Sequence, residues 1–236
     1  MDSKSKYGDD ENIESFMDYY IFYPVGDILL PLFYKLGITP NMITLMSTIC
    51  TITSIYYINL PSRNFKKFAF LYILGYFFDC VDGRLARKYK LGSTFGMVFD
   101  SVSDIISNTL LIIIYVFNFY DKKNFKYLIP ILIVISHKLS VNYGIMEAED
   151  CYKKNKHDNF YKYKKKMLKN FDNTILKIIL KKIYLMIHKA SYQSYRNIYP
   201  IYNKEKIYND LKKTKEIGFG NYSVLVILVI YLTMLN

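Results

Sequence analysis

The sequence has few cysteines and no recognisable signal peptide, and both features narrow the class of protein. Only three cysteines occur among 236 residues, Cys50, Cys80 and Cys151, and none belongs to a CxxC pair. The chain therefore offers neither a disulfide framework nor a zinc-binding motif. The first 20 residues are acidic and polar, without a basic region or a small-residue cleavage site, so no cleavable signal peptide is predicted.

Long apolar runs are what the sequence has in abundance. Hydrophobic residues make up 52% of the chain, and they gather in runs rather than spreading evenly. Apolar runs of roughly 18 or more residues are typical of transmembrane helices. Such runs cover residues 42–60, 66–84, 97–119, 126–146 and 217–235. The sequence thus predicts an all-α integral membrane protein, multi-pass, with a bundle of five to six transmembrane helices.

The residues before the first apolar run predict an element on the membrane surface. Residues 1–15 are polar and are predicted to form a disordered tail. Residues 16–41 are rich in tyrosine and phenylalanine, which suits an interfacial helix in the headgroup region. Within this segment Pro24 and Pro31 are expected to interrupt any long helix. Residues 42–146 would then form the transmembrane core.

A long basic segment, residues 147–216, follows that core. Residues 150–216 carry 18 of the 32 Lys and Arg residues against six acidic residues. Because positively charged loops tend to stay in the cytoplasm, we expect this segment there. Its residues 172–190 predict either a basic amphipathic helix at the interface or a further spanning helix, and three lysines within the apolar stripe favour the interfacial helix. Residues 217–236 would form a C-terminal transmembrane helix.

Lysine alternates with tyrosine in one stretch of the basic segment, KNKHDNFYKYKKKMLKN. Such a pattern occurs in nucleic-acid-binding proteins. In a membrane protein, however, each basic residue near an anionic leaflet contributes about 1 kcal/mol of attraction. Anionic lipid headgroups are therefore the expected partner of this stretch, and nucleic acid is not.

Four aspartates lie in DCVDGRLARKYKLGSTFGMVFDSVSD, which spans the end of the second apolar run and the start of the third. Asp79 and Asp82 are three residues apart and Asp100 and Asp104 four apart, so each pair shares one helix face with Cβ atoms about 5–6 Å apart. Two antiparallel helices would bring all four carboxylates together, where their mutual repulsion calls for a cation. Ligands that offer only oxygen favour Mg²⁺ or Mn²⁺.

The residues between the two pairs of aspartates suit a phosphate-bearing substrate. Gly83 leaves space for a nucleotide to approach the backbone, and Arg87 lies on the same face with a guanidinium suited to bidentate phosphate contact. Ala86 and Gly96 are small enough for two membrane helices to pack closely. An alternative to a metal site is that the aspartates are polar helix caps, neutralised by neighbouring basic side chains. This alternative would explain a single aspartate, but it explains two pairs on shared helix faces less well.

The same stretch resembles the CDP-alcohol phosphotransferase family (class-I CDP-alcohol phosphatidyltransferases), whose signature is D-x2-D-G-x2-A-R-x8-G-x3-D-x3-D. All its fixed positions are present at the family's spacing: Asp79, Asp82, Gly83, Ala86, Arg87, Gly96, Asp100 and Asp104. The resemblance implies a membrane transferase of phospholipid biosynthesis. Such an enzyme displaces CMP from a CDP-linked donor with an alcohol acceptor and forms a phosphodiester.

The resemblance also implies a role for each matching residue. Asp79, Asp82, Asp100 and Asp104 would make up the metal site for two Mg²⁺ or Mn²⁺ ions, with the first three as the ligands, and Asp104 would also be the general base. The remaining signature residues would line the cytidine diphosphate site, and so would two residues of the TPNMIT segment; together they are Gly83, Ala86, Arg87, Gly96, Asn41 and Thr44. This active site is expected on the cytoplasmic side.

The sequence leaves the donor and the acceptor open. Ser101 stands where the choline and ethanolamine enzymes tend to have histidine, which favours CDP-diacylglycerol with an acceptor such as inositol, serine or glycerol phosphate. The alternative is CDP-choline or CDP-ethanolamine with diacylglycerol. A membrane cation transporter and an inactive lipid-binding homologue are further alternatives. The first predicts acidic residues in several helices, and the second predicts a lost aspartate. Family likeness also suggests a homodimer.

Overall fold

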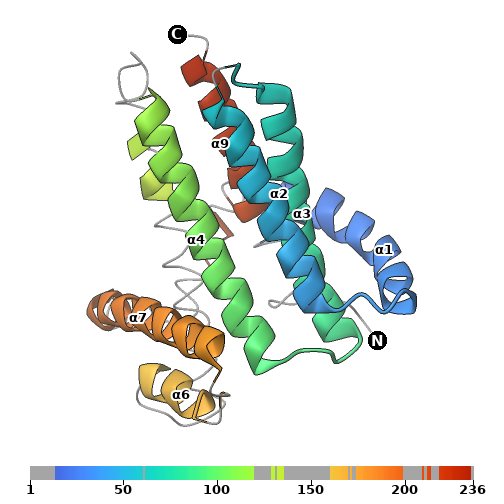
Figure 1. Ribbon diagram of the computed structural model, residues 1–236, viewed down its shortest axis with the longest axis vertical. Coiled ribbons are helices and arrows are strands. Elements are labelled where there is room, and N and C mark those ends of the chain that lie inside the picture. Colours follow the sequence, from blue (N-terminus) through green and yellow to red (C-terminus); the bar gives the residue numbers. More distant parts are fainter. Residues whose placement is uncertain are drawn as a thin grey trace.

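All regular secondary structure in the described part of the chain is helical. The computed structural model describes residues 14–60, 62–119, 129–130, 132–135, 160–169, 171, 174–198, 209, 212–213 and 218–234. Its elements are a π-helix, η1 (Asp18–Phe22), and the helices α1 (Tyr23–Lys35), α2 (Pro40–Asn59), α3 (Phe65–Lys88), α4 (Thr94–Phe119), α6 (Phe160–Met167), α7 (Ile175–Ile198) and α9 (Phe219–Met234) (Figure 1). These residues contain no strand, which agrees with the predicted all-α class.

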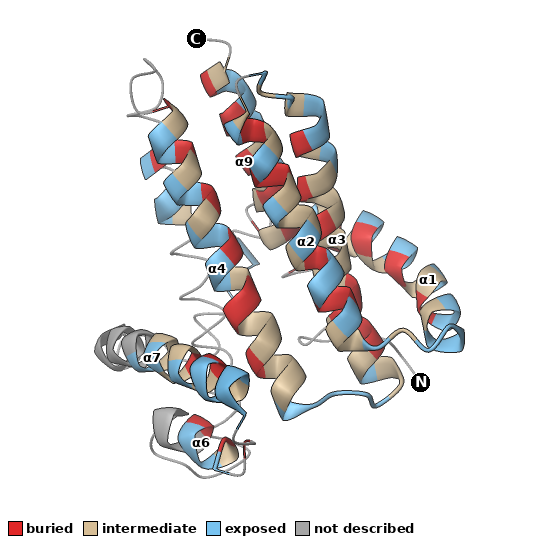
Figure 2. Cartoon of the chain, in the orientation of Figure 1, coloured by how far each residue is buried: buried red, intermediate tan, exposed pale blue. Residues whose placement is uncertain are grey.

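Four long helices, α2, α3, α4 and α9, form the bundle (Figure 1). α2 packs most extensively along α3, and buried positions on the bundle helices face their neighbours (Figure 2). Gly75 permits this close packing, because a Cβ there would lie 2.5 Å from Thr51 Oγ1 and 3.2 Å from the carbonyl oxygen of Ser47. Small residues at such crossings let two membrane helices approach each other.

Two polar residues set where α2 and α3 begin. Thr39 is extended (φ −88°, ψ 157°), as the following Pro40 requires, and its side chain accepts a hydrogen bond from the Met42 N–H. Asn64 Oδ1 accepts a hydrogen bond from the Lys67 N–H, 3.1 Å away, at the start of α3. α2 thus begins at Pro40, two residues before the predicted apolar run 42–60.

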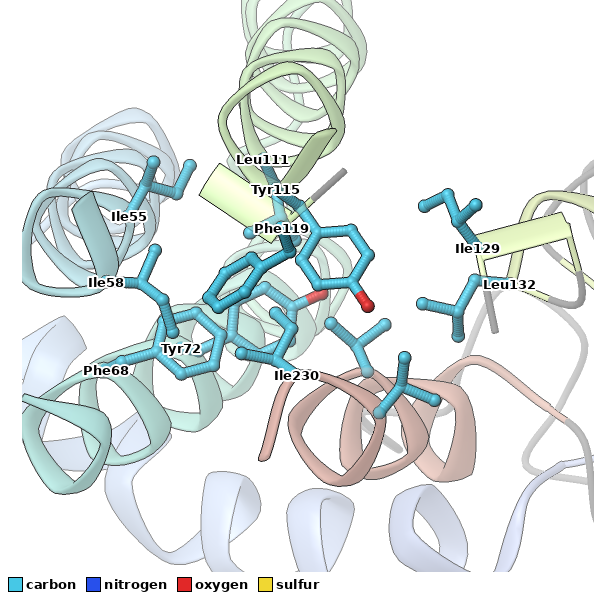
Figure 3. Close-up of a cluster of buried hydrophobic side chains, with 12 residues drawn as sticks. Ile55, Ile58, Phe68, Tyr72, Leu111, Tyr115, Phe119, Ile129, Leu132 and Ile230 are labelled. Atoms are coloured by element: carbon cyan, nitrogen blue, oxygen red, sulfur yellow. The ribbon is translucent and has the colours of Figure 1, made fainter. Parts of the chain in front are cut away.

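Apolar and aromatic side chains fill one end of the bundle (Figure 3). This cluster joins all four long helices and includes Ile55, Ile58, Phe68, Tyr72, Leu111, Tyr115, Phe119 and Ile230. Tyr115 makes a buried hydrogen bond with Thr233, 2.6 Å long, so that the polar groups of α4 and α9 satisfy each other. The aspartate signature lies at the opposite end, which this packing leaves open.

The segment before α2 differs from its prediction in two respects. Pro24 and Pro31 do not interrupt the helix: Pro24 lies in the first turn of α1, where no N–H is needed, and Pro31 is accommodated inside α1. Packing of Leu30, which is fully buried against Val81 and Leu85 of α3, outweighs the hydrogen bond that Pro31 forgoes. The predicted tail also ends earlier, because residues 14 and 15 are buried.

Among the described residues, α2 and α4 are long and apolar enough to cross a membrane. α9 is apolar but has 16 residues, and α3 carries the charged residues of the signature in its last turns. The predicted run 126–146 lies largely outside the described residues. α7 is not among the candidate spans and runs across the signature end of α4 (Figure 1).

Candidate active site

Three of the four signature carboxylates meet where α3 and α4 come together. One oxygen each from Asp79 and Asp82 of α3 and from Asp100 of α4 lie within 4.8 Å of one another. Asp82 is buried, and the Thr44 hydroxyl of α2 donates a hydrogen bond to its Oδ2. Three helices therefore build the centre of the site, and the conformation of Asp82 is set by a residue 38 positions earlier in the chain.

Asp104, the fourth carboxylate, stands beside this group rather than within it. It follows Asp100 by one helical turn of α4, and the three-carboxylate set does not include it. Together with Asp79 it lines a second cavity, described below. The structure thus sets Asp104 apart from the other three, which are the residues placed for a shared ligand.

The three clustered carboxylates fit a hard divalent cation. They offer only oxygen, the ligand type that Mg²⁺ and Mn²⁺ prefer, and oxygens bound to one ion at about 2.0–2.6 Å lie at most about 5 Å apart. The chemistry and the spacing of these donors therefore agree with a metal.

A cavity of about 380 Å³ opens on one side of the carboxylates, and we call it the signature-end cavity. Asp82 and Asp100 line it. All six residues that the sequence predicts for the cytidine diphosphate site line it as well: Asn41, Thr44, Gly83, Ala86, Arg87 and Gly96. The cavity lies within the size range of small-molecule sites, roughly 300–1,000 Å³.

Both signature glycines make room for a polar side chain. A Cβ on Gly83 would lie 3.0 Å from the Arg87 guanidinium, so Arg87 occupies the space that the sequence suggested for a nucleotide. A Cβ on Gly96 would lie 2.6 Å from Asn41 Oδ1, so a larger residue would push this side chain out of place. The two glycines therefore act through Arg87 and Asn41, both of which line the cavity.

Three residues of α6 and α7 complete the signature-end cavity, and the sequence did not single them out. Lys164 is 4% exposed, with its Nζ 5.8 Å from the ring centre of Tyr184, and the Tyr184 ring lies 4.2 Å from that of His188. Lys164 is one of many lysines in a basic segment, so nothing in the sequence predicts that this lysine is buried. The spacing of Leu180, Tyr184 and His188, four residues each, was the available signal, because it places them on one face of α7.

The packing of α7 on α4 holds these residues in place. Leu180 and Tyr184 join Val98 and Val102 of α4 in a buried cluster. Lys181 donates a hydrogen bond to the carbonyl oxygen of Leu168, 2.6 Å away. Lys177, another of the three lysines in the predicted apolar stripe, is also partly buried, with its Nζ 5.7 Å from the centre of the Phe95 ring.

A second cavity, of about 430 Å³, opens on the other side of the carboxylates, where Asp79 and Asp104 line it. Most of its other lining residues carry hydroxyl or amide groups, and we call it the hydroxyl-lined cavity: Ser47, Thr48, Thr51, Tyr72, Tyr76, Ser107, Asn108, Thr109, Tyr222 and Ser223. Ser107 is 6% exposed, and its Oγ has no hydrogen-bond partner within the described residues. Unsatisfied buried hydroxyls of this kind are candidates for ligand contact.

Arg84, one of the basic residues in the alternative explanation of the aspartates, turns toward α1 instead. Its guanidinium forms a salt bridge with Asp27, 2.6 Å long, and lies over the Tyr23 ring at 4.5 Å. Arg84 is 1% exposed, so this contact joins α1 to α3 inside the protein. Its role is structural.

Fold and site together define a helical membrane enzyme that transfers a phosphate-linked group. The family model for CDP-alcohol phosphatidyltransferase matches residues 37–187, from the start of α2 into α7, and the chain belongs to this family. It is a CDP-alcohol phosphotransferase, an enzyme class that uses CDP-alcohol donors and alcohol acceptors. None of the curated proteins and none of the solved structures matches the chain.

The hydrogen bond from Thr44 to Asp82 predicts an effect on metal affinity. Residues that orient a metal ligand typically contribute a factor of about 10–100 in affinity, so Thr44→Val should weaken Mn²⁺ binding by at least about tenfold. Thr48→Val is the matched control, because the Thr48 hydroxyl bonds to the carbonyl oxygen of Thr44 within its own helix. Electron paramagnetic resonance of free Mn²⁺ measures both, and equal affinities in Thr44→Val and wild type would contradict this role.

Proposed function

We propose that this enzyme displaces CMP from a CDP-linked lipid, CDP-diacylglycerol, using a small alcohol acceptor and divalent metal ions. The observation that carries the proposal is the position of one carboxylate cluster between two cavities. Asp82 and Asp100 line the signature-end cavity, while Asp79 and Asp104 line the hydroxyl-lined cavity. Two substrates that approach from opposite sides would meet at these carboxylates, as an in-line displacement requires.

The signature-end cavity is suited to the cytidine diphosphate part of the donor. Arg87 would bind a phosphate through its planar guanidinium, and Lys164 would add a second positive charge from the opposite wall. Asn41, Thr44, Gly83, Ala86 and Gly96 would shape the rest of the nucleotide site. Ser101 also lines this cavity. Because it stands where the choline and ethanolamine enzymes tend to have histidine, it favours CDP-diacylglycerol over the CDP-amino alcohols as the donor.

Asp79, Asp82 and Asp100 would hold the metal, Mg²⁺ or Mn²⁺, and likeness to the family implies two ions. When bound, the metal would stabilise negative charge on the phosphoryl oxygens. The carboxylates themselves would fix the position of the reacting phosphate between the two cavities. Thr44 would keep Asp82 in the orientation that this task requires.

Asp104 would act as the general base toward the acceptor. Its place in the hydroxyl-lined cavity, beside rather than within the three-carboxylate set, supports this role. Asp104 would take the proton of the acceptor hydroxyl as the new oxygen–phosphorus bond forms. The bond between that phosphorus and the CMP oxygen breaks, and CMP leaves with the electron pair through the signature-end cavity.

The arrangement in the membrane is part of the proposal. Five to six helices would span the bilayer, with residues 42–146 as the catalytic core, residues 217–236 as the last span and the active site on the cytoplasmic side. α7 would lie at the interface, since its exposed residues include Ile175, Leu176 and Met186. Exposed lysines of α6, of the turn after it and of α7 would contact anionic headgroups: Lys165, Lys166, Lys169, Lys182 and Lys189. A homodimer stays a prediction from family likeness.

The reaction predicts acceptor-dependent CMP release by the purified protein with Mg²⁺ or Mn²⁺. CDP-diacylglycerol and CDP-choline are tested in turn, each with inositol, serine, glycerol phosphate and diacylglycerol. Asp104→Asn should lower the rate by about 100-fold or more, the usual contribution of a general base. Glu14→Gln is the control, a buried carboxyl remote from the signature in sequence, and should leave the rate near that of wild type.

Release from CDP-diacylglycerol would support the proposed donor. Release from CDP-choline with diacylglycerol alone would replace that donor by the alternative, and full activity in Asp104→Asn would remove the proposed base. Absence of release for every pair, in folded protein with bound Mn²⁺, would contradict the proposed function.

The exposed lysines predict a dependence on anionic lipid. Each contributes about 1 kcal/mol at most near an anionic surface, so replacing Lys165, Lys166, Lys182 and Lys189 by glutamine should weaken the response. CMP release is measured in vesicles of phosphatidylcholine with increasing phosphatidylglycerol. The wild type should be stimulated and the fourfold variant much less so. Identical curves for the two proteins would show that these lysines do not contact anionic headgroups.

A further inference from the structure

Asp18 joins three parts of the chain that are far apart in sequence. It belongs to η1 and is 4% exposed. Its Oδ1 accepts a hydrogen bond from the Tyr76 hydroxyl of α3 at 2.8 Å. Its Oδ2 accepts hydrogen bonds from the Ser15 hydroxyl at 2.7 Å and from the Gly220 N–H of α9 at 3.0 Å. One carboxyl group thus holds the N-terminal segment, the middle of α3 and the start of α9.

The partners of Asp18 belong to the walls of the hydroxyl-lined cavity. Tyr76 lines this cavity directly, one helical turn before Asp79, and Phe219, Tyr222 and Ser223 of α9 line it on another side. Asp18 is not itself among the lining residues. It therefore reaches the cavity through Tyr76 and through the first turn of α9.

The first turn of α9 is shaped to receive Asp18. A Cβ on Gly220 would lie 2.5 Å from Asp18 Oδ1 and 2.6 Å from Ser15 Oγ, so only glycine fits at this position. A free N–H at the start of a helix also favours a negatively charged partner. Asn221 adds a second connection, since its Oδ1 accepts a hydrogen bond from the Met17 N–H at 3.1 Å.

Burial raises the pKa of Asp18 above its usual value, and the hydrogen bonds from Ser15, Tyr76 and Gly220 lower it in part. A carboxyl group in so apolar a position is costly unless its partners compensate it. Anchoring the interfacial segment to α3 does not require the buried Asp18 carboxyl group, because the Arg84–Asp27 salt bridge already joins α1 to α3. The cost suggests a task that packing alone does not perform.

We propose that Asp18 is a positioning residue for the acceptor: it holds Tyr76 and the start of α9 as walls of the hydroxyl-lined cavity beside Asp79 and Asp104. This inference rests on the proposed function, which assigns that cavity to the acceptor alcohol. The interfacial N-terminal segment then has a part in acceptor binding. It has none in binding the donor, whose cavity Asp18 does not adjoin.

The kinetic test compares Asp18→Ala with Asp18→Asn and Tyr76→Phe. Loss of hydrogen bonds to a charged group should raise the KM for the acceptor by about tenfold or more in Asp18→Ala, with the KM for the CDP donor changed by less than about twofold. Asparagine keeps the size and one accepting oxygen, which can serve Gly220, so Asp18→Asn should restore much of the lost affinity. The acceptor is whichever of inositol, serine, glycerol phosphate or diacylglycerol supports CMP release by wild type.

Two comparisons separate positioning from general damage. If Asp18 acts through Tyr76, the acceptor KM of Asp18→Ala/Tyr76→Phe should be close to that of Asp18→Ala alone, because effects on one pathway do not add. Glu14→Gln is the matched control, since Glu14 is buried in the same segment but accepts its hydrogen bond from Tyr23 at 2.9 Å. It should change neither KM.

Hydrogen–deuterium exchange tests the contact without relying on catalysis. Amides at residues 219–222 should exchange at least about tenfold faster in Asp18→Ala than in wild type or Glu14→Gln, because the start of α9 loses its acceptor. Unchanged exchange together with an unchanged acceptor KM would overturn the inference. So would equal increases in both KM values, which indicate general damage. An inactive wild type with the expected exchange pattern would instead contradict the proposed function.

Discussion

The structure depends on placing several carboxylates together between membrane helices. Left alone, Asp79, Asp82 and Asp100 would repel one another in surroundings that screen charge poorly. Their oxygens are arranged to bind a cation, and the Thr44 hydroxyl of α2 donates a hydrogen bond to Asp82. The position of α2 against α3 is set in turn by the close contact at Gly75. The site is therefore a property of three helices and not of the signature alone.

The two ends of the bundle divide the work of stability and chemistry. At one end Phe68, Tyr72, Tyr115 and their neighbours fill the space between all four long helices. Toward the other end the same helices leave two cavities, one on each side of the carboxylates, and the hydroxyl-lined cavity reaches back to Tyr72. α6 and α7 close the first cavity from outside the bundle, and the start of α9 closes the second. Binding sites in helix bundles commonly form in this way, between helices held together elsewhere.

Short-range patterns predicted most of what is local. Spacing placed Asp79, Asp82 and Asp100 on facing sides of two helices, and apolar runs located α2, α3, α4 and α9 to within a few residues. What escaped prediction depends on contacts across the chain. The salt bridge of Arg84 with Asp27 joins residues 57 positions apart, and the hydrogen bond between Asp18 and Gly220 joins residues 202 positions apart. The burial of Lys164 occurs in a basic segment whose lysines look alike in the sequence. Pro31 escaped because tertiary packing, which a local rule ignores, decides whether a helix tolerates it.

In the proposed reaction, donor and acceptor meet at one carboxylate cluster from two separate cavities. A crystal structure of the protein with Mn²⁺ and CDP tests this arrangement, because anomalous scattering locates the metal. We expect Mn²⁺ between Asp79, Asp82 and Asp100, with the diphosphate on the Arg87 side and the hydroxyl-lined cavity free of nucleotide. Mn²⁺ bound away from these carboxylates, or CDP on the Asp104 side, would contradict it.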